Sequence, residues 1–258
     1  MTVRLISLFS GSSGNCTAIS CGGDTILIDA GRSAKAIEEQ LAVVGIDPGT
    51  LRAIFVTHEH IDHVSALRVL TKKHPVPVYA SGGTADALQC CVCRRAPLFE
   101  EHIGNMSVRS FPISHDAACP VGYRIEINAD GGEHIAIGLA TDTGTVTDEI
   151  LRGLDGCRAV VLESNHDLKM LQSGPYPAQL KQRIRSRLGH LSNTDSADLA
   201  AALALKGTEQ IILAHISKEN NIPSLALSTC LERLQSFGVT ANVLTALPST
   251  PVGVTVEF

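Results

Sequence analysis

The sequence predicts an α/β fold in a single domain. Short β-branched runs alternate with longer stretches of helical periodicity through all 258 residues, and no linker rich in Pro, Gly or Ser divides them. A chain of this length can bury a sizeable core. Hydrophobic residues make up 44% of the sequence, aromatic residues only 3%, and Trp is absent, so we expect a mainly aliphatic core.

Turn residues and hydrophobic periodicity set the expected elements. Besides an apolar strand near the N-terminus, strands are expected over residues 25–28, 53–56, 76–79, 107–113, 123–127, 134–139, 158–162, 210–213 and 241–244. Helices are expected over residues 34–44, 62–73, 83–89, 147–153, 177–188, 194–205 and 224–237. Thr147 can cap its helix, and Gly238 can end the last one.

Composition excludes several classes of protein. A formal net charge of −5 argues against a protein that coats nucleic acid non-specifically. No apolar stretch approaches the roughly 20 residues that span a bilayer, and no signal peptide is recognisable, so a cytoplasmic location is expected. The eight cysteines are expected to be reduced and buried, because Cys90, Cys91 and Cys93 have no second CxxC pair to complete a zinc site.

The loop after the expected strand 53–56 contains four potential metal ligands within six positions: His58, His60, Asp62 and His63. His58 and His60 are two residues apart, so an extended loop places both side chains on one side. Asp62 and His63, at the start of the next helix, can point back into the same space. Imidazoles with a carboxylate suit zinc or another first-row divalent ion. A solvated turn rich in histidine is the alternative, and Glu59 and Ile61 are expected to be spacers.

Three later strands each deliver one more candidate ligand at the carboxyl end, where α/β sheets bind ligands. These residues are His115, Asp142 and His215. Each alone could be a capping or surface residue, but together with the first loop they predict a convergent site for two metal ions. His74, His102 and His134 have no such placement and are expected at the surface.

The motif THEHIDH (57–63) resembles the HxHxDH signature of the metallo-β-lactamase fold. The order of His115, Asp142 and His215 after it is similar to that of the dinuclear hydrolases of this family, over about residues 1–220. The resemblance implies an αβ/βα four-layer sandwich, in which helices flank two central mixed sheets and the metals lie at one rim. It also implies that His58, His60 and His115 hold one ion, Asp62, His63 and His215 hold the other, and Asp142 bridges them.

Seven further motifs resemble the YycJ/WalJ-type subgroup of this family, described as DNA exonucleases. They are SGSSGN (10–15), LIDAG (27–31), SHDAA (114–118), ATDTG (140–144), ESNHD (163–167), GHLSN (189–193) and LAHISKENN (213–221). Cys16 and Cys119, within or beside these motifs, and the segment CCVC (90–93) are departures that leave the ligands intact. The resemblance implies a phosphodiesterase with two zinc or manganese ions per chain and nucleic acid, most simply DNA, as its substrate.

In such an enzyme two ions roughly 3.5–4 Å apart hold a bridging water, lower its pKa and clamp a phosphoryl oxygen. Asp62 would orient this nucleophile. His190 resembles the proton-donating histidine of ribonuclease Z, and Glu163 would correspond to the carboxylate that polarises it. His166 could instead bind phosphate or aid the same step, and a capping or structural role is the alternative for both histidines.

Substrate contacts are expected from two loops. Ser12, Ser13 and Asn15 form a turn suited to phosphate oxygens, or else a structural hairpin turn. Lys218 and Asn220 follow His215 closely and are expected to border the site. The expected helix 177–188 carries four basic residues that would form two stripes, which either track phosphates or are a solvated face: Lys181, Arg183, Arg185 and Arg187.

Two other functions remain open at this point. One is hydrolysis of a small, for example cyclic, phosphodiester or of a thioester, because a fold does not fix its substrate. The other is a metal-binding module without turnover. Seven candidate ligands argue against this module, since a structural zinc site needs only four closed ligands.

Overall fold

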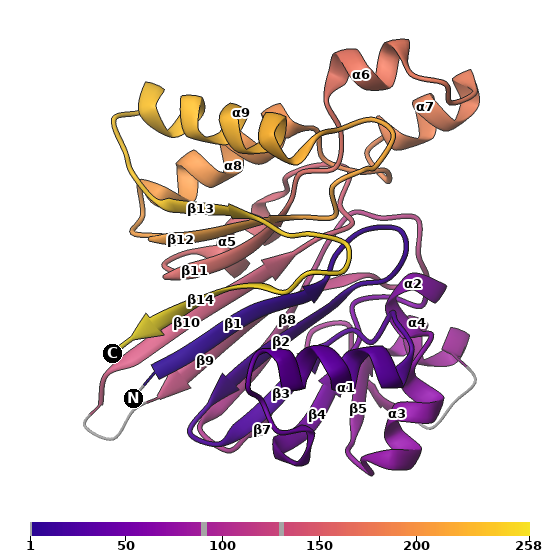
Figure 1. The fold of residues 1–258 in the computed structure, drawn as a ribbon, viewed down its shortest axis with the longest axis vertical. Helices are drawn as coiled ribbons and strands as arrows, with labels where there is room; N and C mark the ends of the chain where they lie inside the picture. Colours follow the sequence, from indigo (N-terminus) through magenta and orange to yellow (C-terminus); the bar gives the residue numbers. More distant parts are fainter. Residues whose placement is uncertain (1, 89–91, 129–131) are drawn as a thin grey trace.

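Two seven-stranded mixed sheets pack face to face in the computed structural model, which describes residues 2–88, 92–128 and 132–258. Helices cover the outer face of each sheet (Figure 1). This arrangement confirms the expected αβ/βα four-layer sandwich. Both termini lie at the same end of the molecule, away from α2 (Figure 1).

The first sheet has the strand order β14-β1-β2-β3-β4-β5-β6, and the second has β13-β12-β11-β10-β9-β8-β7. The strands of the first sheet are β1 (Thr2–Phe9), β2 (Cys16–Cys21), β3 (Asp24–Ile28), β4 (Leu51–Phe55), β5 (Val78–Ser81), β6 (Cys93–Arg95) and β14 (Val252–Glu257). Those of the second are β7 (Glu100–Ile103), β8 (Met106–Pro112), β9 (Val121–Asn128), β10 (His134–Ala140), β11 (Ala159–Glu163), β12 (Gln210–Ala214) and β13 (Asn242–Thr245). The helices are α1 (Ala34–Val43), α2 (Ile61–Val64), α3 (Leu67–Lys73), α4 (Gly82–Leu88), α5 (Asp148–Leu154), α6 (Leu168–Ser173), α7 (Ala178–Ile184), α8 (Asn193–Ala204) and α9 (Pro223–Ser236), with a 3₁₀ turn η1 (Pro48–Thr50).

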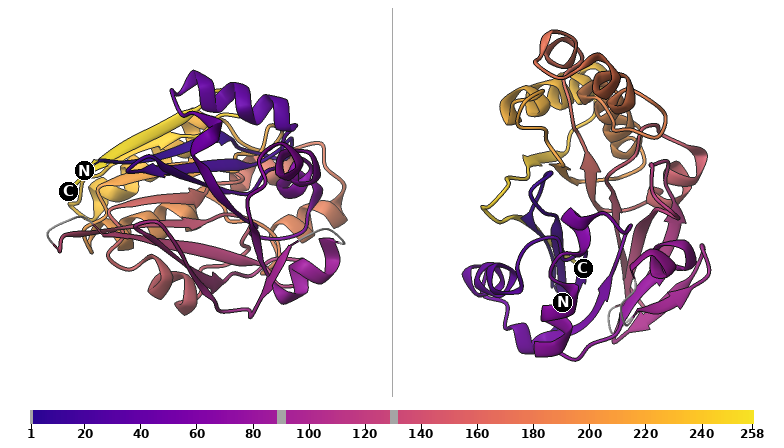
Figure 2. Two further views of the ribbon diagram at one scale, coloured as in Figure 1. Left: turned by 90° about the horizontal axis from the view of Figure 1, so that it is seen from below. Right: turned by 90° about the vertical axis from the view of Figure 1, so that its right-hand side faces the viewer.

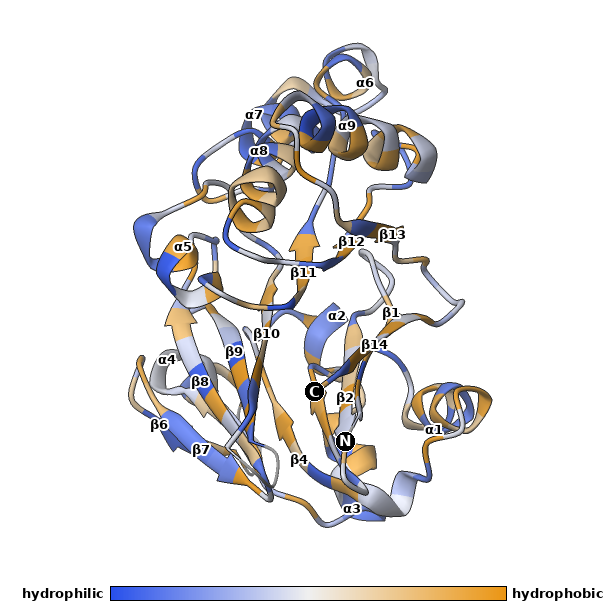
Figure 3. Cartoon of the chain, turned by 90° about the vertical axis from the view of Figure 1, so that its left-hand side faces the viewer, coloured by the Kyte–Doolittle hydropathy of each residue, from blue (hydrophilic) through white to orange (hydrophobic). Residues whose placement is uncertain are grey.

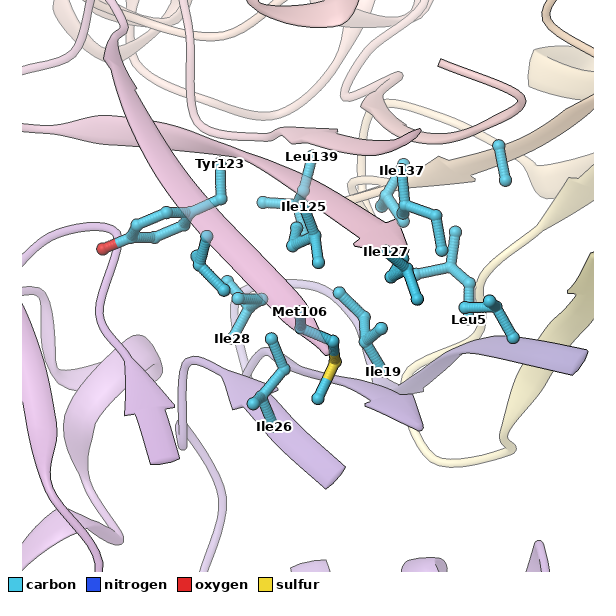
Figure 4. Close-up of a cluster of buried hydrophobic side chains, with 14 of the residues drawn as sticks. Leu5, Ile19, Ile26, Ile28, Met106, Tyr123, Ile125, Ile127, Ile137 and Leu139 are labelled. Atoms are coloured by element: carbon cyan, nitrogen blue, oxygen red, sulfur yellow. The ribbon is translucent and has the colours of Figure 1, made fainter. Parts of the chain in front are cut away.

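The inner core lies between the two sheets and is mainly aliphatic, as expected from the composition. Side chains such as Ile19 from the first sheet and Ile125 from the second meet there (Figure 4). Each fully buried aliphatic side chain contributes about 1.5–3 kcal/mol relative to exposure. Aromatic residues also join this core: Phe55 stacks on Tyr79, and the buried Tyr123 hydroxyl donates a 2.6 Å hydrogen bond to the Val56 carbonyl.

The outer layers follow from amphipathic helices. Ile37 and Leu41 of α1 and Leu70 of α3 are buried against the first sheet. On the other side α5, α8 and α9 pack on the second sheet (Figure 2). The buried alanines of α8 allow close approach. Coloured by hydropathy, the strands are mostly hydrophobic, and helices such as α1 and α9 show both kinds of residue (Figure 3). The pairs β3–β4, β10–β11 and β11–β12 are parallel, which brings the carboxyl ends of the strands in each set together.

The prediction of one continuous helix over residues 62–73 is wrong, because the chain forms two helices there, α2 and α3. The carbonyl oxygen of Asp62 accepts a hydrogen bond from the Asn15 amide (2.8 Å), and that of His63 accepts one from the Ala30 amide (2.7 Å). Because these carbonyls accept hydrogen bonds from neighbouring loops, they do not take part in a continuous helix. The expected helix 177–188 is also too long, since α7 ends at Ile184. There the chain turns back, with the His190 amide bonded to the Ile184 carbonyl (2.9 Å).

Most other expected elements are found within a few residues of their predicted limits, but β2, β6, β7, β14 and α6 were missed. Thr147 caps α5 as predicted, and Gly238 follows α9 with φ +67°. Gln89, Cys90 and Cys91 lie outside the described residues. Four of the described cysteines are buried, whereas Cys93 and Cys119 are half-buried, so the burial prediction is wrong for these two. Within the described ranges, none of the helices has the length and apolar character to cross a membrane.

Candidate metal centre

Strained backbone marks the rim where the strands end. Of the residues that the structure describes, three other than glycine have positive φ angles: Asp29 (63°), Asp142 (57°) and His215 (54°). Each follows a strand, β3, β10 or β12, by one or two residues. Such a conformation costs about 1–3 kcal/mol and persists only where the surroundings impose it, which is common at functional sites. The strain places all three side chains at this rim.

Three overlapping groups of side chains at the rim could each hold a metal ion. Their possible ligand atoms lie within 4.8 Å of one another in every group. The groups are His58, His60 and His115; His58, His63 and Asp142; and Asp142, Glu163, His190 and His215. The ring centres of His58 and His60 are 4.5 Å apart, which agrees with the expected placement of both on one side of the loop. Six of the seven predicted ligands therefore belong to one connected cluster.

Four of the predicted histidine ligands use Nδ1 for a protein contact. Nδ1 of His58 lies 3.0 Å from Thr57 Oγ1, that of His63 lies 2.8 Å from Asp29 Oδ2, and that of His115 lies 3.2 Å from the Gly189 carbonyl. Nδ1 of His215 lies 2.8 Å from Glu163 Oε1. Such contacts fix the ring orientation of a metal-binding histidine and leave Nε2 for the ion.

The chemistry of the buried atoms fits a metal ion. His58 Nε2 and Asp142 Oδ2 are both buried, and neither has a hydrogen-bond partner among the described residues. Buried polar atoms are normally paired, so two orphaned atoms in one cluster call for a ligand. Burial and then His63 lower the pKa of His58, which keeps its imidazole neutral and able to bind metal. Burial raises the pKa of Asp142, but His215 and His63 outweigh it and bring the pKa well below the usual range.

Asp29 is a functional candidate that the sequence reasoning missed. Its Oδ1 accepts the Thr57 amide and its Oδ2 accepts the Thr57 hydroxyl, both at 2.8 Å, while Oδ2 also faces His63. Burial lowers the pKa of His63, but Asp142 and Asp29 outweigh burial and raise it to about 9. Asp29 thus orients His63 from behind. A polar residue directly after a strand was the signal that could have found it.

Glu163 joins two histidines through a single oxygen. This fully buried residue has Oε1 2.8 Å from Nδ1 of both His190 and His215. Its Oε2 accepts the amides of Thr143 (2.9 Å) and Leu191 (3.0 Å). Burial raises the pKa of Glu163, but His190 and His215 outweigh burial and lower it to about 2. The expected pairing of Glu163 with His190 is therefore present, and His215 shares it.

Asp62 lies at the edge of the cluster and belongs to none of its three groups as far as the described residues go. Its side chain is 24% exposed, and its Oδ2 is 3.7 Å from His63 Nε2. Asn15 Nδ2 lies 3.4 Å from this Oδ2 and 3.0 Å from His63 Nε2. A Cβ atom on Gly31 would lie 1.6 Å from the Asp62 carbonyl oxygen, so only glycine fits there. Asn15, which is expected to bind substrate, contacts Asp62 and His63.

The other predicted site residues have contrasting positions. Ser12 and Lys218 are exposed and line one cavity, whereas Ser13 is half-buried and accepts a hydrogen bond from Arg32. His166 is buried, and burial lowers its pKa to about 4. Asn220 is fully buried beneath Gly174, on which a Cβ atom would lie 2.7 Å from Asn220 Oδ1.

Glu59 is not the expected spacer. Its carboxylate accepts the Ala118 amide (2.7 Å) and the Thr84 hydroxyl (3.3 Å). It therefore ties the loop that carries His58 and His60 to the loop that carries His115. Ile61 behaves as predicted and is exposed.

The prediction of two basic stripes on one helix is wrong, because α7 ends at Ile184. Lys181 Nζ donates to the Gln172 carbonyl (2.8 Å), and Arg183 Nε donates to Asp116 Oδ2 (2.8 Å). Arg185 and Arg187 are exposed beyond the last helical turn. Of the histidines expected at the surface, His102 and His134 are exposed and His74 is half-buried, 2.9 Å from Glu38.

Comparisons with known proteins agree with this arrangement. A family described as "Beta-lactamase superfamily domain" matches residues 24–216. The chain is 37% identical over 247 residues to "Exodeoxyribonuclease YycJ" of Bacillus anthracis, covering 92% of this chain and 91% of the relative. It is 36% identical over 262 residues to "Exodeoxyribonuclease WalJ" of Streptococcus pneumoniae serotype 2, covering 96% of each chain. The crystal structure of the metallo-β-lactamase fold protein YhfI from Bacillus subtilis superposes with a TM-score of 0.71 at 15% identity, covering 98% of this chain and 99% of that one.

Proposed function

Because this chain belongs to the beta-lactamase superfamily and has the metallo-β-lactamase fold, we propose that it is a metal-dependent phosphodiesterase that degrades DNA from an end. Its likeness to exodeoxyribonucleases along nearly its whole length supports a nucleic-acid substrate. The observation that carries the proposal is a pair of buried atoms in a histidine cluster, His58 Nε2 and Asp142 Oδ2, that have no hydrogen-bond partner among the described residues.

The proposed ligands form two sets that share one carboxylate. His58, His60 and His115 would hold one ion, and Asp62, His63 and His215 the other, with Asp142 common to both. Zinc and manganese both suit such mixed imidazole and carboxylate ligands. Bound ions would act as Lewis acids and make water a stronger nucleophile near neutral pH.

The protein's own groups would position water and move the proton. Asp62 is partly exposed and held beside Asn15, so its carboxylate can orient an attacking water at the open side of the cluster. His190 is half-buried, and its Nδ1 lies 2.8 Å from Oε1 of Glu163, a carboxylate that would orient the ring. The other nitrogen, Nε2, can then donate a proton to the oxygen that leaves phosphorus.

A time course on end-labelled nucleic acids tests the proposal. Wild type and Asp62→Ala would be compared on 5′- and 3′-labelled single- and double-stranded DNA and RNA, with metal content measured on the same samples. We expect two metal ions per wild-type chain, stepwise shortening of DNA from one end, and a loss of at least a hundredfold in Asp62→Ala, about the cost of removing one acid–base group. Wild type with less than one metal per chain, inert with added zinc or manganese, would refute the proposal.

A further inference from the structure

A cavity of about 370 Å³ adjoins the proposed metal centre. His190 and His215 form its inner wall. Tyr176, Leu180 and Arg183 also line it and belong to the arm built from α6, α7 and their connection. This arm stands beside α9 and away from the two sheets (Figure 1). The cavity is therefore lined both by proposed reacting groups and by the α6–α7 arm, which contributes few side chains to the core.

Tyr176 differs in position from the other tyrosines of the chain. The sequence has three tyrosines, and two of them, Tyr79 and Tyr123, pack in the core between the sheets. Tyr176 is half-buried and lines the cavity. Prolines at 175 and 177 flank it, and their fixed φ angles restrict the backbone on both sides. A ring held in this way loses little conformational freedom when a flat partner stacks on it.

The remaining lining suits an amphipathic anion. Leu180 and Ile216 supply apolar surface. Lys218 and Arg183 supply positive charge, while Glu219 and Asp116, which pairs with Arg183, also line the cavity. Arg183 is 62% exposed and is anchored at its Nε by Asp116, the residue after His115. Arg183 therefore lines the cavity while bonded to a neighbour of a proposed metal ligand. Aromatic and apolar walls with a few cations are the features that bind a base and its phosphate.

We propose that this cavity binds the terminal nucleotide of the strand being hydrolysed, with its base stacked on Tyr176 and its phosphate at the His190 end. The proposal rests on the proposed function and names the subsite that would make cleavage start from an end. The volume is near the lower limit of ligand pockets, roughly 300–1,000 Å³. A cavity of this size accepts one nucleotide.

Binding of a mononucleotide tests the cavity independently of DNA cleavage. Metal-loaded wild type, Tyr176→Ala and Tyr176→Phe would be titrated calorimetrically with deoxyadenosine monophosphate and with 2-deoxyribose 5-phosphate, which lacks the base. We expect Tyr176→Ala to weaken nucleotide binding by about tenfold to a hundredfold, the range for loss of one stacked base. Binding of the sugar phosphate should stay within about twofold, and Tyr176→Phe should bind like wild type. Equal nucleotide affinities of wild type and Tyr176→Ala would overturn the proposal, as would an equal loss for both ligands.

Hydrolysis of bis(p-nitrophenyl) phosphate by the same proteins separates the two proposals. Activity of wild type on this generic diester decides the proposed function, because the reaction needs no stacked nucleotide at Tyr176. If wild type is inert on this diester and on DNA, the proposed function fails, and the titrations still decide the cavity. Tyr176→Ala that keeps diester hydrolysis but shortens DNA about tenfold more slowly supports the subsite. Equal losses on both substrates would overturn it, because they indicate a general structural role.

Discussion

Glu59→Ala should weaken metal binding although Glu59 is not itself a proposed ligand. The Glu59 carboxylate joins the His58–His60 loop to Ala118 and Thr84, and the segment before Ala118 carries His115. Removing it frees the third histidine of the first proposed ion site from the first two. The substitution leaves every proposed ligand in the chain, so any change in affinity comes from their arrangement.

The expected size follows from the two hydrogen bonds. A bond to a charged acceptor contributes about 1.5–3 kcal/mol, but Glu59 is half-buried and water partly replaces its contacts. We therefore expect the metal-free protein to lose about 1–2 kcal/mol of unfolding free energy. Mutating groups that support metal ligands typically lowers the metal affinity about 10–100-fold. Glu59 holds a loop and does not contact the ring of a ligand histidine, so we expect a loss of about tenfold, at the lower end of this range. Glu59→Gln keeps an acceptor for the Ala118 amide and should lose less of both.

Zinc affinity would be measured by competition with a chelating dye, and stability by urea denaturation of the metal-free proteins. Glu101→Ala is a matched control, since Glu101 is also a half-buried glutamate and pairs with Arg95 at the edge of the second sheet. The control should lose stability yet keep the zinc affinity of wild type. Glu59→Ala with wild-type zinc affinity would show that the link between the two loops does not organise the site.

Three further predictions concern metal, DNA and pH. Chelation should lower the melting temperature, and zinc at 100 times its dissociation constant should restore about 5–10 °C in calorimetry, whereas Asp142→Asn should regain less than half of this. Replacing both Arg185 and Arg187 by Ala should reduce the slope of log affinity for DNA against log salt by about 1–2, and an unchanged slope would exclude phosphate contacts there. Hydrogen bonds from Lys73 and His74 lower the pKa of Glu38 below its usual 4.5, so their stabilisation is present above that pH and is lost as pH falls. Glu38→Gln should therefore cost under about 1 kcal/mol at pH 7 and nothing near pH 3 in urea denaturation.

The predictable part of the site consists of residues that follow strands. His58, His115, Asp142 and His215 follow apolar runs by two or three residues, and the carboxyl ends of strands that run in one direction lie at one rim. Hydrophobic periodicity therefore located most of the cluster without any knowledge of distances. Asp29 also follows a strand, but no histidine stands beside it in the sequence to mark it as a candidate.

The unpredictable part depends on contacts to backbone groups far along the chain. Glu59 accepts a hydrogen bond from the Ala118 amide, 59 residues later. Almost every residue has a backbone amide, so the sequence does not show which one will be the donor. The end of α7 likewise depends on the turn that returns the chain to His190, which hydrophobic periodicity does not reveal. Asn15 looked like a phosphate-binding residue because its type fits that task, yet its position beside Asp62 and His63 comes from loop packing.

The shared oxygen of Glu163 limits which substitutions can separate proton donation from metal binding. Because Oε1 faces Nδ1 of both His190 and His215, Glu163→Gln would disturb the proposed proton donor and a proposed ligand together. A loss of activity in that variant would not distinguish the two roles. His190→Gln leaves the contact between Glu163 and His215 in place, so it changes only the proton donor. If His190 donates the proton, this variant should keep its metals and lose rate mainly on diesters with poor leaving groups, since good leaving groups depart without a proton.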